Sequence, residues 1–308
     1  MTAIDHILFG ALVFFWGASL GSFTNVLIHR IPLDMSIVSP RSSCPSCHHM
    51  IRWYENIPVL SYLFLRGRCR GCNISISPRY LFIELGAGLW SLALAQRFIW
   101  PVLSRPELWI YDYPALYAVI AKWMWFTVFI CALLAITFID LRYTFIPDEI
   151  SIPMIFIGCF GGFAIPSADP LASFWGLLGG AGVILCVRWL GWLIFQREAM
   201  GLGDAKLLAV IGAFLGWRVL PHILFLSAFQ GIIAALLASL YTRFTGKSNA
   251  LTLTSAELDE RFGEIGMYPE SKSHLVIPFG PFLCLAAFEV LEVGADTLLQ
   301  WWVDLLLP

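Results

Sequence analysis

Eight separate apolar stretches constrain this chain more than any other feature of its sequence. They lie at about residues 7–28, 80–103, 114–138, 147–165, 171–195, 205–217, 219–241 and 275–303. A helix needs about 20 mostly apolar residues to cross a bilayer, and most of the stretches approach that length. Only 13% of the 308 residues are charged, about half the share usual in soluble domains. The sequence therefore predicts an all-α polytopic membrane protein with about eight transmembrane helices in the lipid bilayer.

The charges beside the first stretch predict how the chain is oriented. Asp5 and His6 precede this stretch and Arg30 follows it, which is the reverse of the charge order in a secretory signal peptide. Seven arginines then occur between residues 30 and 79, against only Asp34 and Glu55. By the positive-inside rule this loop is cytoplasmic and the N-terminus lies on the opposite side of the membrane. Seven of the 19 basic residues cluster in this loop and the net charge of the chain is −2, so nucleic acid is not an expected partner.

The alternation of apolar and polar segments predicts three parts. Residues 1–29 hold the first transmembrane helix, residues 30–79 form a cytoplasmic insertion, and residues 80–308 form the membrane core. Counted from an external N-terminus, the loops at 139–147, 196–204 and 242–274 all face the cytoplasm. The last of these loops contains five acidic residues: Glu257, Asp259, Glu260, Glu264 and Glu270. A charge run of this kind is usually a solvated surface.

Four of the eight cysteines form two Cys-x2-Cys pairs in the insertion, 21 residues apart: Cys44, Cys47, Cys69 and Cys72. This spacing is typical of a structural zinc site with four thiolates, which leaves no open position for catalysis. Disulfides are the alternative, but a reducing cytosol disfavours them. An imidazole of His48 or His49 could also replace one thiolate. The other four cysteines lie in apolar segments and are expected to be packing residues: Cys131, Cys159, Cys186 and Cys284.

Two aspartates stand where apolar stretches begin or end. Asp204 follows Gly201-Leu202-Gly203 at the start of one stretch, and Asp140 closes another. An ionisable group at membrane depth is a functional candidate by default. Two glycines before Asp204 would let a substrate or another backbone approach closely. Asp204 could instead be an ordinary helix N-cap.

Two alternatives concern the partner of Asp204. Asp140 could be an interfacial anchor paired with Arg142. Asp148 could replace it in the site, since Pro147 can begin a helix whose first turn favours an acidic side chain. Whichever pair forms, two carboxylates in close contact cannot both ionise easily, so one retains a proton. Such a pair can carry out aspartyl proteolysis, with one group activating water and the other polarising the peptide carbonyl.

Several motifs along the chain resemble those of the type IV prepilin peptidases. Gly21-Ser22-Phe23-Thr24-Asn25-Val26 and His29-Arg30-Ile31-Pro32 resemble the N-terminal signature of this family. The segments 44–47, 53–61 and 65–72 resemble its large cytoplasmic loop, and Arg79-Tyr80 with Glu84 resembles the end of that loop. The pattern of Asp140, six residues and Pro147 resembles the family's first aspartate motif, which favours Asp140 over Asp148. Gly201-Leu202-Gly203-Asp204 resembles its second.

The resemblance implies a bifunctional enzyme of the bacterial inner membrane. It would cut the short basic leader from type IV prepilins or type II secretion pseudopilins at the cytoplasmic face, using Asp140 and Asp204. It would then methylate the new N-terminal residue, usually phenylalanine, with S-adenosylmethionine. Glu55 and Asn56, which are polar residues among apolar neighbours, are candidates for binding that cofactor. A transporter with an acidic relay and an inactive zinc-stabilised scaffold are the alternative functions.

Overall fold

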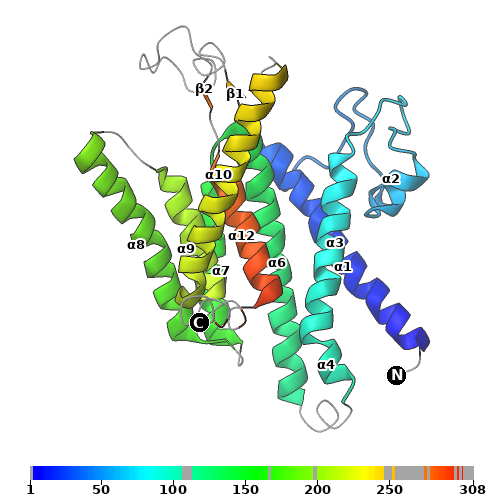
Figure 1. Cartoon of the computed structure of the whole chain (residues 1–308). Helices are drawn as coiled ribbons and strands as arrows, with labels where there is room; N and C mark the ends of the chain where they lie inside the picture. The colour runs from blue at the N-terminus through cyan, green and yellow to red at the C-terminus, as the bar shows by residue number, and fades with distance from the viewer. Residues whose placement is uncertain are drawn as a thin grey trace. The chain divides into compact units, whose positions relative to one another are not determined.

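The described part of this computed structural model is mostly helical (Figure 1). It covers residues 3–105, 113–165, 168–196, 200–245, 252–253, 274–275, 278–294, 297 and 300. The chain forms two compact units, Met1–Arg218 and Val219–Pro308. The long helices of the first unit are α1 (Ala3–Arg30), α3 (Arg79–Phe98), α6 (Tyr113–Tyr143), α7 (Asp148–Ala164), α8 (Pro170–Phe195) and α9 (Leu202–Leu215). Its shorter elements are η1 (Ile31–Leu33), η2 (Trp53–Asn56), α2 (Leu60–Phe64) and α4 (Trp100–Leu103).

The second unit is built from α10 (Leu220–Thr245) and α12 (Gly280–Val293). A short helical turn, η3 (Trp217–Val219), leads into α10. The strands β1 (Thr252–Leu253) and β2 (His274–Leu275) pair antiparallel. Between α10 and α12, Gln230 Nε2 donates to Glu289 Oε2 at 2.7 Å, so the two helices share a polar contact as well as apolar packing. The predicted polar loop at 242–274 lies largely outside the described residues.

Four segments in the described ranges are long and apolar enough to cross a membrane: Ile4–Leu33, Pro114–Tyr143, Pro170–Ile194 and Trp217–Phe244. The prediction of a helical, multi-pass membrane protein is therefore confirmed at this level. Helices α7, α9 and α12 have 17, 14 and 14 residues. At 1.5 Å per residue a 14-residue helix is about 21 Å long, shorter than the hydrocarbon core. The count of eight crossings stays a prediction.

Helices α1 and α3 lie against each other through small residues. A Cβ added to Gly17 would collide with Ser91, and one added to Gly21 would lie 2.8 Å from the Ala87 Cβ. The Ser91 hydroxyl donates to the Val13 carbonyl at 2.9 Å. Small side chains permit such close backbone approach in membrane helix pairs. The two helices that flank the cysteine-bearing loop are thus held together by their own contacts.

Helices α8 and α9 approach even more closely. A Cβ added to Gly176 would collide with the Gly212 carbonyl, and one added to Gly180 would collide with the Leu208 carbonyl. Gly176 and Gly180 are spaced as in the Gly-x-x-x-Gly motif, which allows backbones to touch. This contact fixes the position of α9, and Asp204 lies in the first turn of that helix.

We expect Gly176→Ala to destabilise the protein, because the added methyl group meets backbone atoms that cannot move aside. Overpacking of this kind costs at least about 1–3 kcal/mol. Gly182→Ala is the matched control on the same helix, since nothing lies within 4 Å of a Cβ at that position. Thermal unfolding of both variants in detergent measures the difference. Equal midpoints would show that α8 and α9 are not closely packed.

Candidate functional site

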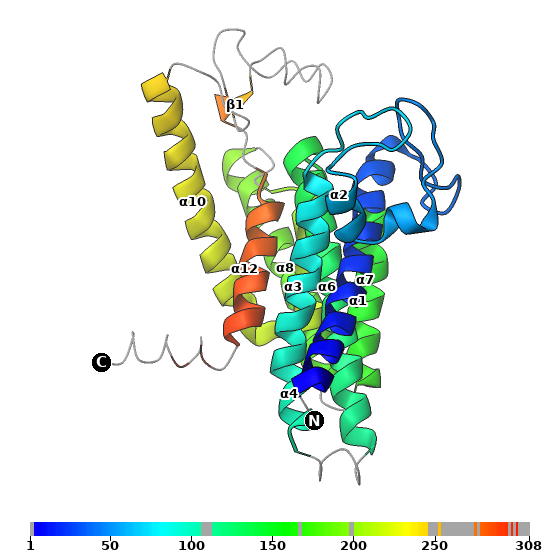
Figure 2. The same cartoon turned by 90° about the vertical axis from the view of Figure 1, so that its right-hand side faces the viewer.

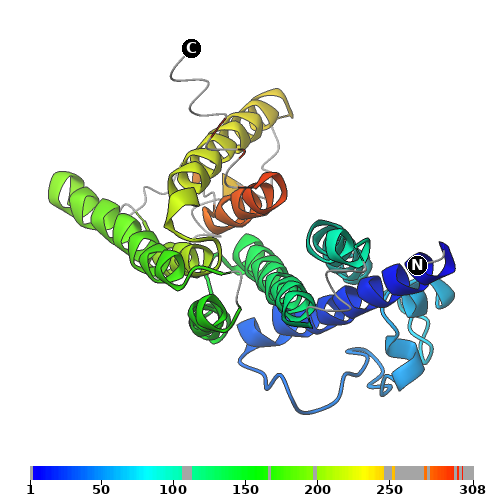
Figure 3. The ribbon, with the colours of Figure 1, turned by 90° about the horizontal axis from the view of Figure 1, so that it is seen from below.

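The cysteine-bearing loop and the end of α6 lie at the same end of the first unit. The cysteine-bearing loop leaves α1 and enters α3 at the upper end in Figures 1 and 2, where α6 also ends. Arg142, near the end of α6, is close enough to His29 of α1 to interact with it electrostatically. Seen along the helices, the loop lies beside α1 (Figure 3). The loop and the end of α6 that carries Asp140 therefore share one end of the structure.

The four cysteines of the loop form one cluster. Their sulfur atoms all lie within 4.8 Å of one another. Cys44 Sγ is 3.9 Å from Cys72 Sγ, and Cys47 Sγ is 3.9 Å from Cys69 Sγ. Four sulfurs at 2.3 Å from a tetrahedral zinc ion would lie about 3.8 Å apart. The cluster fits a zinc ion, whereas a disulfide would need an S–S distance of about 2 Å.

Each Cys-x2-Cys pair is shaped by the same local backbone. The His48 N–H donates to the Cys44 carbonyl, and the Asn73 N–H donates to the Cys69 carbonyl, both at 2.9 Å. His48 and Asn73 have φ values of 56° and 59°, a left-handed conformation that histidine and asparagine adopt more readily than most residues. Each turn directs two sulfurs to one point, so two similar half-sites together make the tetrahedron.

Backbone donors also favour the thiolate form of one cysteine, Cys44. Hydrogen bonds from the N–H groups of Cys47 and Ser46 lower the pKa of the Cys44 thiol to about 6. The thiolate is the form that binds zinc. Burial and the neighbouring thiols raise the pKa of Cys47 to about 12. The spacing of the four sulfur atoms is therefore the feature that suits a cation.

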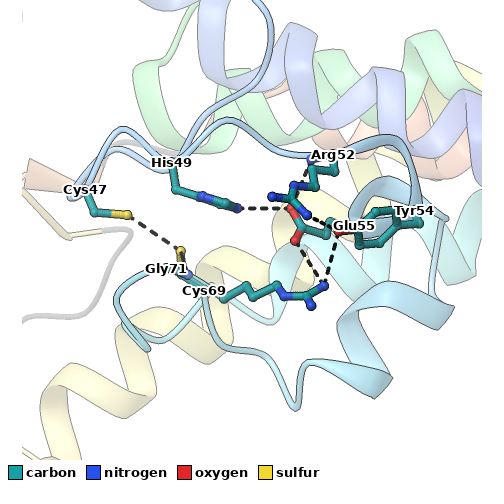
Figure 4. Close-up of polar contacts among 8 residues, drawn as sticks. Cys47, His49, Arg52, Tyr54, Glu55, Cys69 and Gly71 are labelled. Atoms are coloured by element: carbon teal, nitrogen blue, oxygen red, sulfur yellow. Dashed lines mark hydrogen bonds and ion pairs between the residues drawn. The ribbon is translucent and has the colours of Figure 1, made fainter.

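Glu55 joins the two halves of the cluster (Figure 4). Its side chain is only 5% exposed. His49, beside the first cysteine pair, has Nε2 at 3.2 Å from Glu55 Oε2, and Arg70, within the second pair, has Nη1 at 3.5 Å from Glu55 Oε1. The Arg52 N–H donates to Oε2 at 3.0 Å, and this bond is the main reason why the pKa of Glu55 lies below its usual value. His49 is thus engaged with Glu55, while the sulfur cluster contains cysteines alone.

A strained turn follows η2. Val59 has φ 64° and ψ −53°, and the Leu60 N–H donates to the Pro58 carbonyl at 2.6 Å. These are the features of a γ-turn with positive φ, a rare conformation for a β-branched residue. Strain of this kind costs about 1–3 kcal/mol and persists only where the surroundings impose it. Here the Val59 N–H donates to Oε2 of the buried Glu84 on α3 at 2.7 Å.

Asp140 lies in the last turn of α6 and is buried. Arg142, two residues after Asp140, is exposed, and its guanidinium carbon lies 5.3 Å from the centroid of the Tyr143 ring. Residues two apart do not face each other on a helix. The helix geometry therefore does not favour the anchoring pair between Asp140 and Arg142.

Asp204 lies in the first turn of α9, but Gly201 is the N-cap residue. The Asp204 carboxylate accepts a hydrogen bond from the Gly201 N–H, as the third residue of a capping box does. A Cβ on Gly203 would lie 3.2 Å from the Ile146 Cβ. The Gly-x-Gly pair therefore brings the start of α9 close to the segment that joins α6 to α7.

Asp148 has a partner of its own. Lys206 Nζ lies 2.5 Å from Asp148 Oδ1, and the Asp148 side chain is 51% exposed. Asp148 and Glu149 form the first turn of α7, after Pro147 as N-cap. An exposed, ion-paired carboxylate at a helix start is explained by local charge alone.

Contacts between α6 and α9 place Asp140 and Asp204 at one level. The rings of Phe129 and Phe214 stack with centroids 4.4 Å apart. From this stack Asp140 is about 16 Å along α6, and Asp204 is about 15 Å along α9. The two helices run in opposite directions, since Gly203 meets Ile146 just beyond the end of α6. Both aspartates therefore lie at the end of the unit from which the cysteine-bearing loop extends.

These features define a class of protein: a helical membrane protein with a thiolate cluster in a loop after its first helix, and two aspartates at that end of its core. The comparisons with known proteins specify the class further. Residues 15–98 match the family model of the bacterial peptidase A24 N-terminal domain, and residues 127–236 match that of the type IV leader peptidase family.

Curated relatives cover almost the whole chain. A protein of Myxococcus xanthus, named prepilin leader peptidase/N-methyltransferase, is 35% identical over 98% of this chain and 93% of its own length. Relatives of the same name from Aeromonas salmonicida and Aeromonas hydrophila are 32% and 33% identical, over 97% and 96% of this chain and 96% and 94% of their own. No solved structure matches. The chain belongs to the type IV leader peptidase family, and the prediction of a bifunctional peptidase and N-methyltransferase is confirmed at that level.

Sequence reasoning assigned no role to Glu84. It lies in the motif at the end of the loop, but its partner Val59 is 25 residues away. The sequence signal for a role of Glu84 is that this charged residue lies within a stretch of apolar residues. Nothing in the sequence indicates the positive φ of Val59, since valine is among the residues least suited to that conformation.

Proposed function

We propose that Asp140 and Asp204 form the proteolytic pair of this enzyme and that its substrates are prepilins or pseudopilins. The observation that carries the proposal is their common level at one end of α6 and α9, next to the Gly-x-Gly turn. Asp148 fits the role less well, because Lys206 neutralises it. Gly201, Gly203 and Pro147 shape the turns around the pair. The names of the relatives, prepilin leader peptidase/N-methyltransferase, support the substrate.

Proteolysis by this pair needs no metal. The ionised carboxylate takes a proton from water as the water attacks the peptide carbonyl, and the protonated carboxylate polarises that carbonyl. The tetrahedral intermediate then collapses, a proton passes to the amine, and the leader is released with a new carboxylate. Two carboxylates in close contact cannot both ionise easily, so the pair would share one proton.

We propose that residues 30–79 form a zinc-stabilised domain that methylates the new N-terminus. Cys44, Cys47, Cys69 and Cys72 would hold the ion, which supplies stability rather than chemistry. The methyl donor, S-adenosylmethionine, would bind beside η2. Asn56 is exposed there, and Trp53 is 76% exposed and offers an aromatic face to a sulfonium cation. Glu55 would hold this turn in place through the contacts of its carboxylate.

We propose that the chain lies in the bacterial inner membrane with a periplasmic N-terminus and a cytoplasmic site. The arginines of residues 30–79 support this orientation. Helices α3, α7, α9 and α12 would complete the eight crossings. The leader of the substrate, which is basic, would then stay on the same side as the aspartates, with the hydrophobic helix of the substrate in the membrane.

The test uses the purified full-length protein, a synthetic prepilin and S-adenosylmethionine, without added ATP or metal. We expect mass spectrometry to show a shortened product that carries one extra methyl group. Omission of S-adenosylmethionine should give the shortened product without the methyl group. A product that is cut but never methylated would contradict the second activity. An intact substrate would contradict the first and favour the transporter.

A further inference from the structure

Glu84 is a buried carboxylate that connects the loop to the membrane helices. It lies in the first two turns of α3, among residues that pack against α1. The Val59 N–H donates to Oε2 at 2.7 Å, and the Ser22 hydroxyl of α1 also hydrogen-bonds to the carboxylate. A carboxylate at this depth is costly unless it is well hydrogen-bonded. The position of Glu84 thus gives the γ-turn at Val59 a fixed attachment point.

The attached turn leads directly to the cysteine cluster. Val59 follows Glu55 by four residues, and Glu55 contacts His49 and Arg70, one beside each cysteine pair. A chain of contacts therefore runs from the cluster through η2 and the γ-turn to α1 and α3. The ends of the loop are held separately, since Arg30 donates to the Ser36 and Pro40 carbonyls and the Asn25 amide donates to the Tyr80 carbonyl. Glu84 instead reaches the middle of the loop.

We propose that Glu84 is a positioning residue for methyl transfer. Its carboxylate holds the zinc-bearing loop on the helix pair α1 and α3, at the end of the unit where Asp140 and Asp204 lie. The inference rests on the proposed function, in which this loop methylates the N-terminus that the aspartates release. Glu84 acts through the Val59 turn and touches neither substrate nor cofactor. Asp140 and Asp204 lie on α6 and α9, so the loss of Glu84 should impair methylation while cleavage continues.

The test compares Glu84→Ala and Glu84→Gln in the purified full-length protein, with a prepilin substrate and S-adenosylmethionine. Alanine removes the acceptor of the Val59 N–H, whereas the glutamine amide oxygen can still accept it. We expect kcat for methylation to fall ~10- to 100-fold in Glu84→Ala, which is typical of a small misplacement of reacting groups. The KM for S-adenosylmethionine, the cleavage rate and the zinc content should stay unchanged, and Glu84→Gln should restore most of the methylation.

Asp34→Asn is the matched control, because Asp34 is an exposed acid of the same loop with φ 52°, which asparagine tolerates. It should leave both activities unchanged. Unaltered methylation in Glu84→Ala, or an equal loss of both activities, would overturn the inference. If Glu84→Ala does not insert into the membrane, Ser22→Ala is the second variant, because it removes one hydrogen bond to the Glu84 carboxylate. It should lower methylation and leave cleavage unchanged. Unchanged methylation in Ser22→Ala would also overturn the inference. A wild-type enzyme that cuts but does not methylate would instead refute the proposed function.

Discussion

Asp140→Asn and Asp204→Asn should each abolish leader cleavage, while the protein still inserts into the membrane and binds zinc. The pair needs one ionised and one protonated carboxylate, and an amide can replace neither in proton transfer. We expect a loss of ~10³-fold or more from either change, because general acid and general base catalysis both depend on the pair. The double variant should be little worse than each single one, since the two groups act as a unit.

The measurement is the initial rate of prepilin cleavage, followed by mass spectrometry. Asp148→Asn is the matched control, because it removes a carboxylate at the same end that already pairs with Lys206. An exposed ion pair contributes about 0–1 kcal/mol, so cleavage should change little. Normal cleavage by Asp140→Asn together with inactive Asp148→Asn would show that Asp148 is the true partner.

Replacement of Cys69 by serine should remove the zinc ion and abolish methylation, while cleavage by the membrane helices continues. Wild-type protein should contain about one zinc per chain, since four thiolates complete one site. In zinc-finger peptides the ion contributes about 10–16 kcal/mol of folding free energy. A loop of this size with few apolar contacts of its own therefore cannot keep its shape without the ion.

Zinc content is measured by elemental analysis, alongside both activities. Cys186→Ser is the control, since Cys186 is an exposed thiol on α8 outside the cluster. Acidification should release the ion as well, because protons compete with zinc for the thiolates. A double replacement of Cys44 and Cys69 that retains the full zinc content would refute the four-thiolate site.

The features that could be predicted from the sequence are those set by local physics. Apolar length determined where the helices lie, and the Cys-x2-Cys spacing determined which four sulfurs meet, because each pair is closed by a single turn. The Gly-x-Gly-Asp run indicated a close approach, and Gly203 does meet Ile146. Each of these signals lies within one continuous stretch or one short motif of the chain.

The contacts between distant segments could not be predicted in this way. Nothing local indicates that Lys206 pairs with Asp148, 58 residues earlier, or that Glu84 accepts from Val59. Both contacts depend on how the helices pack against each other. Where glycines bring α8 and α9 together, the fit of the two helix surfaces sets their relative position, and no pattern of polar and apolar residues indicates it. The sequence predicts eight membrane crossings, and this count stays a prediction because several helices are shorter than the hydrocarbon core.

The contact of α1 with α3 has a consequence for how enzymes of this architecture can diverge. Gly17 and Gly21 bring the two helices together, and Asn25 ties the start of α3 to α1, so the ends of the intervening segment stay adjacent whatever that segment contains. Insertions there should leave the helical hairpin in place, whereas loss of the turn at Val59 would deprive the buried Glu84 carboxylate of its backbone donor. The segment between Arg30 and Arg79 can therefore vary in length without separating the two helices that carry it, provided that the turn at Val59 is kept.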